Sequence, residues 1–251
     1  VVLLHGFPQT FWSWRRVMPA LAAAGFRAVA PDQRGYSPGA RPEGVEAYRM
    51  PHLVADVVGM LDALGADRAD VVGHDWGAAV AWQLAGRHPD RVRSLTAVSV
   101  PHPLAFVDAL RTDDDQRERS QYMKLFQLEG KAEEVLLRSE DSGLRTFFGD
   151  AQDVQPYLDL MHQPGVLTKC LSWYRAQDLS DISVMGPTTV PTLYVWSDDD
   201  LALGPAAAHA TASHVTGPYR FEILHGVSHW IPEEAPGELS TWLLEHLAAH
   251  G

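Results

Sequence analysis

Short apolar runs alternate with amphipathic helical repeats along the first part of the chain. Runs rich in β-branched residues predict buried strands, and apolar positions that recur every three to four residues predict helices. The predicted strands cover residues 1–4, 26–31, 69–74 and 92–100, and the predicted helices cover 11–25, 52–65 and 77–89. This alternation indicates an α/β fold with a mostly parallel sheet and helices on both of its faces.

The alternation stops after Pro103. Residues 104–188 predict helices in a polar, irregular sequence, and strands return at 190–196 and 219–224 before a final helix at 237–250. An insertion between two halves of a sheet lies at the carboxyl ends of the strands, where open α/β sheets bind ligands. We therefore predict a core formed by residues 1–103 and 189–251, and a helical cap, or lid, formed by residues 104–188.

The composition narrows the class of protein without indicating a function. The chain has 251 residues, of which 46% are hydrophobic, and this suffices for one sizeable core. Its net charge of −12 argues against a nucleic-acid partner, because binding to phosphates needs a basic surplus. Its single cysteine, Cys170, allows no internal disulfide.

Membrane and targeting segments are not evident in the sequence. No apolar run approaches the roughly 18–20 residues that cross a bilayer. No signal peptide is visible, so we expect a cytoplasmic protein without a membrane span. The chain opens with VVLLHG rather than with methionine, which leaves open a targeting segment before it.

The segment VVGHDWGAAV, residues 71–80, carries the first candidate for chemistry. A strand, a turn bracketed by Gly73 and Gly77, and a helix form the context of a nucleophile elbow. The central residue of this turn is Asp75, where a serine is more usual. The alternative is that Asp75 only caps the helix, a position that aspartate favours.

Chain order favours a catalytic role for Asp75. In this layout an acid follows a late strand and a histidine comes last. Three carboxylates follow the first of the two late strands, and two histidines follow the second: Asp198, Asp199, Asp200, His225 and His229. From the residues alone, two of the carboxylates belong to an ordinary solvated loop, and His225 is a candidate for a structural histidine.

Four segments together resemble the epoxide hydrolases and their dehalogenase relatives within the α/β-hydrolase fold superfamily: HGFPQ, GHDWG, VWSDDD and GVSHWIPEEAP. The resemblance covers nearly the whole chain. It implies that Asp75 is the nucleophile, that Asp200 is the acid, and that His229, which precedes a tryptophan, is the base. It also implies that the backbone N–H groups of Phe7 and Trp76 form an oxyanion hole.

Two segments of the predicted lid add a pair of tyrosines. SQYMKLFQLEGKAEEVL contains Tyr122, and CLSWYRAQ contains Tyr174. A tyrosine in a helical lid most often serves only packing. Both segments, however, resemble the lid stretches that carry the epoxide-activating tyrosines of epoxide hydrolases, and the resemblance implies that role for Tyr122 and Tyr174.

An aspartate suits ring opening at a saturated carbon, because it is ionised at neutral pH and needs no base to attack. We interpret the sequence as a hydrolase that opens a small apolar epoxide to a vicinal diol through a covalent ester on Asp75. Tyr122 and Tyr174 would stabilise the leaving oxygen, and His229 with Asp200 would activate the water that breaks the ester. This chemistry requires no metal and no organic cofactor.

Other interpretations share some of these residues. A haloalkane dehalogenase would use the same triad and would be served by Trp76, although that family commonly has asparagine where this chain has Phe7. A fluoroacetate dehalogenase typically has arginine in place of Trp76, and an esterase needs a hydroxyl at the elbow. A non-catalytic binding protein of this fold often loses a triad member, and none is lost here. The tyrosine pair favours the epoxide.

The family pattern usually begins with two strands before the first strand of this chain. We therefore expect the first strands of the fold to be missing and the run at 26–31 to lie at an exposed sheet edge. An exposed edge predicts that the protein has low solubility or is a fragment of a longer chain. Pairing of this edge with a second copy would give a homodimer. The natural substrate and the stereochemistry of the reaction are beyond the sequence.

Overall fold

The computed structural model describes residues 1–138, 143–149, 151, 153–183 and 185–250, and the predicted parallel sheet is present in it. Five strands pair in chain order, each parallel to the next. The strands are β1 (Val2–Leu4), β2 (Ala69–His74), β3 (Val92–Val98), β4 (Thr192–Ser197) and β5 (Tyr219–Leu224). Strands β2 to β4 are buried almost throughout, which explains why their sequences are largely apolar.

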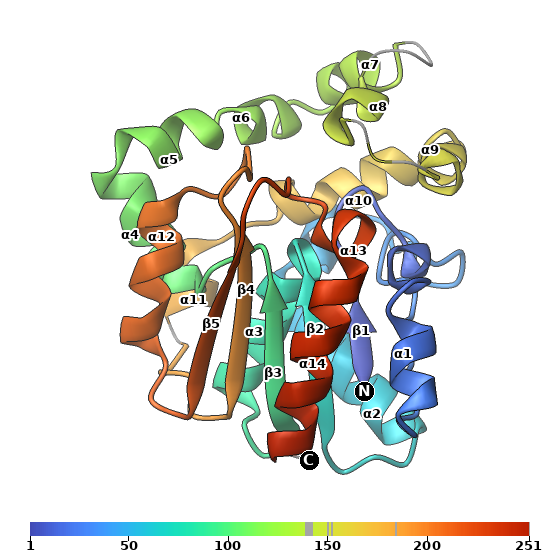
Figure 1. The fold of residues 1–251 in the computed structure, drawn as a ribbon. Helices are drawn as coiled ribbons and strands as arrows, with labels where there is room; N and C mark the ends of the chain where they lie inside the picture. Colours follow the sequence, from blue (N-terminus) through green and yellow to red (C-terminus); the bar gives the residue numbers. More distant parts are fainter. Residues whose placement is uncertain (139–142, 150, 152, 184, 251) are drawn as a thin grey trace.

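Helices cover both faces of the sheet, as predicted (Figure 1). The helices of the core are α1 (Met18–Ala23), α2 (Met50–Ala63), α3 (Trp76–Arg87), α12 (Pro205–Ala210), α13 (Ile231–Glu234) and α14 (Pro236–His250), with the 3-10 helices η1 (Phe11–Trp14), η2 (Val45–Tyr48) and η3 (Thr211–His214). On one face, α1 and α14 pack against the strands in a cluster that includes Leu21, Val72 and Leu243. On the other face, α2 and α3 pack in a cluster that includes Val57 and Leu95.

A run of helices joins β3 to β4, and several of them lie across the carboxyl ends of the strands (Figure 1). They are α4 (Pro103–Thr112), α5 (Asp114–Arg119), α6 (Tyr122–Phe126), α7 (Lys131–Leu136), α8 (Leu144–Phe147), α9 (Gln155–Met161), α10 (Val166–Arg175) and α11 (Leu179–Ser183). Parts of the lid range predicted from the sequence lie outside the described residues, namely 139–142, 150, 152 and 184, as does residue 251 of the core. None of the described helices combines the length and the apolar character that a membrane crossing requires.

Aromatic side chains join the lid to the core. The ring of Phe7 lies 5.4 Å from that of Phe126 and 5.5 Å from that of Tyr174. The indole of Trp76 lies 5.0 Å from the Tyr174 ring. Edge-to-face pairs of this kind bury a large apolar area, so the lid is packed onto the loops that follow the strands.

The prediction of a strand at 26–31 is wrong. Only Val29 pairs there, in an isolated bridge to Val2. The N–H of Val29 donates to the carbonyl oxygen of Val1, and its carbonyl accepts from the N–H of Leu3, both at 2.9 Å. The run therefore meets β1 at one bridge, whereas the other edge of β1 forms a three-residue ladder with β2.

Two other predicted elements are shorter than expected. The helix predicted at 11–25 is divided, because α1 begins only at Met18 and carries Pro19 in its first turn. Proline lacks an N–H and is tolerated in the first turn but not in a helix interior. The strand predicted to end at Val100 ends at Val98, because Ser99 adopts a φ of 68° that breaks the extended backbone.

Candidate active site

Asp75 occupies the tight turn between β2 and α3. Its φ of 53° and ψ of −123° lie in a region that residues other than glycine rarely adopt, at a cost of about 1–3 kcal/mol. Its side chain makes no capping bond to α3 within the described chain, so it does not serve the helix end. A strained turn that presents a side chain beyond a central strand is the geometry of a nucleophile elbow.

Three glycines allow other backbone segments to approach this turn. A Cβ atom on Gly73 would lie 2.2 Å from the carbonyl oxygen of Gly77, and one on Gly77 would lie 2.1 Å from the carbonyl oxygen of Leu4. A Cβ atom on Gly6 would lie 2.2 Å from Oδ1 of Asp75. Since these distances are far below van der Waals contact, any larger residue at these three positions would displace the elbow.

Asp200 and His229 lie in the loops that follow β4 and β5, and the imidazole of His229 joins both carboxylates. Its Nδ1 lies 2.7 Å from Oδ2 of Asp200, and its Nε2 lies 3.4 Å from Oδ2 of Asp75. Asp200 is fully buried, and its Oδ1 accepts hydrogen bonds from the N–H groups of Ala202 and Leu203 at 2.8 and 3.0 Å. These bonds fix the carboxylate and, through it, the orientation of the imidazole.

The other candidates from the sequence lie outside this cluster. Asp198 and His225 pair with each other on the surface, with 2.6 Å between Oδ2 and Nδ1. Asp199 is exposed at the rim of a cavity. The structure thus brings together Asp75, the last aspartate of its run and the histidine that precedes a tryptophan.

Two backbone N–H groups approach the Asp75 carboxylate. The N–H of Phe7 donates to Oδ1 at 2.7 Å. The N–H of Trp76, the first residue of α3, also lowers the pKa of this carboxyl group and so favours its charged form. The start of a helix favours negative charge, so these donors can stabilise charge that develops on Oδ1.

The charged groups of the site shift one another's pKa. Burial by itself would raise the pKa of Asp75, but His229 and the N–H of Trp76 hold it below its usual value. Burial by itself would lower the pKa of His229, but the carboxylates of Asp200 and Asp75 raise it to about 10. The resting site therefore holds an ionised Asp75 beside a protonated imidazole at neutral pH.

Two buried side chains hold the backbone of His229, and sequence patterns gave neither of them a role in the site. The hydroxyl of Ser99 donates to the carbonyl oxygen of His229 at 2.9 Å, and Nε2 of His74 lies 2.9 Å from the same oxygen. Ser99 adopts positive φ to reach it. Its position after a strand is its one signal in the sequence, and many loop residues share that signal.

Tyr122 at the start of α6 and Tyr174 near the end of α10 face each other beside Asp75. Their ring centroids are 6.3 Å apart, and the two ring planes are nearly perpendicular at 80°. Burial raises the pKa of both hydroxyls above the usual value, and the charge of Asp75 raises both further. Both phenols therefore stay protonated at neutral pH and can donate hydrogen bonds.

Polar residues of the same two lid segments hold α6 and α10 together. The guanidinium of Arg175 pairs with both carboxylate oxygens of Glu133 at 2.9 and 3.0 Å, and its Nε donates to the carbonyl of Phe126 at 3.0 Å. Nε2 of Gln127 donates to the carbonyl of Tyr174 at 2.7 Å. We call Gln127, Glu133 and Arg175 the lid clamp, because together they fix the two tyrosines relative to each other.

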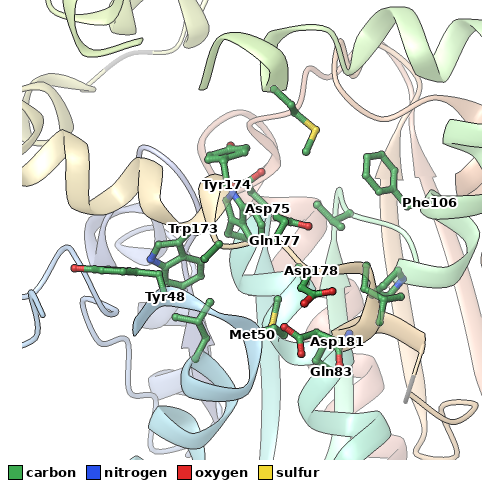
Figure 2. A pocket seen from close by; sticks show the side chains of 18 of the residues that line it. Tyr48, Met50, Asp75, Gln83, Phe106, Trp173, Tyr174, Gln177, Asp178 and Asp181 are labelled. Carbon is green, nitrogen blue, oxygen red and sulfur yellow. The ribbon is translucent and has the colours of Figure 1, made fainter. Parts of the chain in front are cut away.

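Two cavities meet at Asp75, and Tyr122 and Tyr174 line both of them. The narrow cavity, of about 100 Å³, runs from Asp75 past the aromatic lid residues to Gln83 on α3 (Figure 2). The wide cavity, of about 810 Å³, is lined by His229 and by α8 of the lid. In the part of the chain that the structure describes, no group of three His, Cys, Asp or Glu side chains could hold a metal ion.

The raised pKa of His229 predicts a pH-dependent stability. A folded-state pKa of about 10, against an ordinary value of 6.5, gives a stabilisation that is complete below pH 6.5 and is lost as the pH rises through 10. In urea titrations between these limits, we expect the free energy of unfolding to fall with pH more steeply in the wild type than in His229→Gln, by up to about 1.4 kcal/mol per pH unit. Equal slopes would mean that the imidazole carries no such charge in the folded state.

Three kinds of comparison relate the chain to known proteins. A family model described as alpha/beta hydrolase fold matches residues 1–236. The chain is 35% identical to epoxide hydrolase A of Mycobacterium tuberculosis and 34% identical to the AB hydrolase superfamily protein YfhM of Bacillus subtilis, in both cases over 98% of this chain and 89% of the relative. The crystal structure of epoxide hydrolase A from Mycobacterium thermoresistibile superposes with a TM-score of 0.87 at 30% identity, over 100% of this chain and 91% of that one.

Proposed function

The chain belongs to the alpha/beta hydrolase fold family and is an epoxide hydrolase-like hydrolase, and on this premise we propose that it opens a small apolar epoxide to a vicinal diol through a covalent ester on Asp75. The family membership confirms the fold class and the enzyme class predicted from the sequence. One observation supports the proposed reaction most: an ionised carboxylate on a strained turn stands beside two buried tyrosine hydroxyls where two cavities meet.

The first step uses the carboxylate oxygen that the backbone leaves free. Oδ1 of Asp75 is held by the N–H of Phe7, whereas Oδ2 faces His229. Oδ2 attacks one epoxide carbon and forms a C–O bond while the ring C–O bond breaks, and the ring oxygen keeps the electron pair. Tyr122 or Tyr174 gives this oxygen a proton, because both hydroxyls are still protonated. No base is needed in this step.

Formation of the ester changes the charge around His229. The ester is neutral, so one of the two carboxylates that raise the pKa of His229 no longer does so. His229 then gives its proton to the tyrosinate and becomes a neutral base.

Hydrolysis of the ester restores the resting site. A water molecule loses a proton to Nε2 of His229, and the hydroxide attacks Cγ of Asp75. Negative charge collects on Oδ1, against the N–H groups of Phe7 and Trp76. When the intermediate collapses, the diol oxygen leaves and takes a proton from His229. The carboxyl proton of Asp75 then returns to the imidazole.

Repeated turnover in oxygen-18 water tests the proposed ester. The hydroxide oxygen stays on Cγ when the diol leaves, so we expect the label in the peptide that contains Asp75. Mass analysis of the digested protein measures it. An unlabelled Asp75 together with a labelled diol would mean that water attacks the epoxide directly, and the ester mechanism would be abandoned.

Removal of both lid hydroxyls should slow ring opening strongly. In the double variant Tyr122→Phe/Tyr174→Phe, we expect kcat/KM for an epoxide to fall by about 10²–10⁴-fold, because the leaving oxygen loses its proton donors. Tyr157→Phe is the matched control, since its hydroxyl bonds to Glu233 and it lines neither cavity. Displacement of halide from a haloalkane needs no proton donor, so any such activity should survive in the double variant. An unchanged rate with epoxides would refute the role of the tyrosines.

A further inference from the structure

The narrow cavity ends in polar side chains that the proposed reaction does not use. Near Asp75 its walls are largely aromatic, but its far part is lined by Gln83, Asp178 and Asp181 (Figure 2). Gln83 lies on α3 and is only 1% exposed. A buried polar residue at the far end of a substrate cavity suggests a second point of recognition.

One hydrogen-bond donor of Gln83 is left without a partner. Oε1 of Gln83 accepts from Nε of Arg87 at 2.8 Å, and this bond orients the amide so that Nε2 is the free end. Nε2 is buried, and no described residue accepts a hydrogen bond from it. A buried donor without a partner is destabilising, so its presence beside a cavity calls for an acceptor that binds there.

Charge at this end of the cavity selects against an anionic ligand. The carboxylates of Asp178 and Asp181 line the cavity, and Arg49 pairs with them at 2.9 and 3.0 Å. Arg87 donates to the carbonyl oxygen of Asp181. Neither arginine is among the described residues that line the cavity, so a ligand meets the two carboxylates first. A negative tail would be repelled, whereas a neutral oxygen can accept from Gln83.

Building on the proposed function, we propose that Gln83 binds the substrate tail and that the enzyme acts on epoxides with an unbranched chain and a neutral oxygen acceptor, such as an ether, ester or hydroxyl. The distance along α3 sets the length of the substrate's unbranched chain. The eight residues from Asp75 to Gln83 span about 12 Å of helix. An extended chain covers about 3.5 Å for every three bonds, so the acceptor lies about ten bonds from the ring.

Four terminal epoxides of equal length test this on the wild-type protein. One is an alkyl epoxide, one has an ether oxygen about ten bonds from the ring, one has the ether oxygen close to the ring, and one ends in a carboxylate. We expect kcat/KM to be highest for the distant ether, about tenfold above the alkyl epoxide, and lowest for the carboxylate. Equal values for the alkyl epoxide and both ethers, or a preference for the carboxylate, would overturn the inference. No turnover of any of the four would instead overturn the proposed function.

Variants of Gln83 distinguish the effect of its amide N–H donors from the effect of its side-chain shape. Gln83→Met and Gln83→Glu both lack the amide N–H groups, and Gln83→Glu keeps an acceptor for Arg87. We expect both to bring the ratio of kcat/KM between the distant ether and the alkyl epoxide to about one. Gln155→Met on α9, an exposed glutamine that lines neither cavity, should keep the wild-type ratio. A ratio that survives in both Gln83 variants would overturn the assignment. If neither variant folds, the dependence of the wild type on oxygen position decides the question alone.

Discussion

Asp75→Asn is expected to lower kcat/KM for epoxide hydrolysis by about 10⁴-fold or more while the protein stays folded. The amide has the size of the carboxylate, and asparagine tolerates positive φ better than most residues. The amide carries no charge, however, so it neither attacks an epoxide carbon nor raises the pKa of His229. Steady-state kinetics with a terminal epoxide measure the loss, and circular dichroism with thermal unfolding checks the fold.

Asp198→Asn is the matched control for this experiment. Asp198 is exposed and pairs with His225 rather than with the site, so its replacement should leave kcat/KM within about twofold, as for most surface substitutions. If Asp75→Asn kept more than a tenth of the wild-type activity, the ester could not be an obligatory intermediate.

His229→Gln is expected to stop the reaction after ring opening. Attack by Asp75 needs no base, so the variant should still react once with an epoxide and then retain the ester. Hydrolysis needs a proton acceptor next to the ester, and we expect kcat to fall by about 10³–10⁴-fold. Intact-protein mass spectrometry should show a gain equal to the mass of one epoxide, located by peptide mapping at Asp75.

The control for the histidine is His225→Gln, since His225 is exposed and does not contact Asp75. The His225→Gln variant should hydrolyse the epoxide at the wild-type rate and accumulate no covalent adduct. Loss of activity in His229→Gln without an adduct would show that the imidazole is also required for ring opening. The division of the two steps between Asp75 and His229 would then be wrong.

Sequence patterns predicted the strands within the sheet well and failed at one edge of it. β2 and β5 occupy the predicted ranges. The run at 26–31 is also mostly apolar, yet its one β-bridge is that of Val29 with Val2. Its neighbour β1 forms a three-residue ladder with β2 on the other side, so an apolar composition alone does not make this run a strand. Pairing between this run and its neighbour is a long-range contact, which a local pattern does not contain.

Chain order and resemblance identified residues that the structure brings to one point, but not the contacts that hold them. Asp75, Asp200 and His229 each follow a strand, and parallel strands end at one edge of the sheet. Ser99 also follows a strand, but its positive φ and its bond to His229 leave no trace in the sequence. The unpaired donor of Gln83 is equally hidden, because it depends on how Arg87 turns the amide.

The lid clamp allows chemistry and substrate choice to evolve separately. Glu133, Arg175 and Gln127 carry the two tyrosines as one unit. Helix α8 borders the wide cavity through Phe147 but contributes nothing to the clamp among the described contacts. Phe147 packs against the Tyr122 ring at a centroid distance of 6.5 Å, so substitutions elsewhere in α8, such as at Thr146, are the ones that can reshape the wide cavity without disturbing the two tyrosines. Under the proposed reaction, a lid built in this way gives natural selection, or an engineer, positions at which substrate selectivity can change while the two tyrosines stay in place.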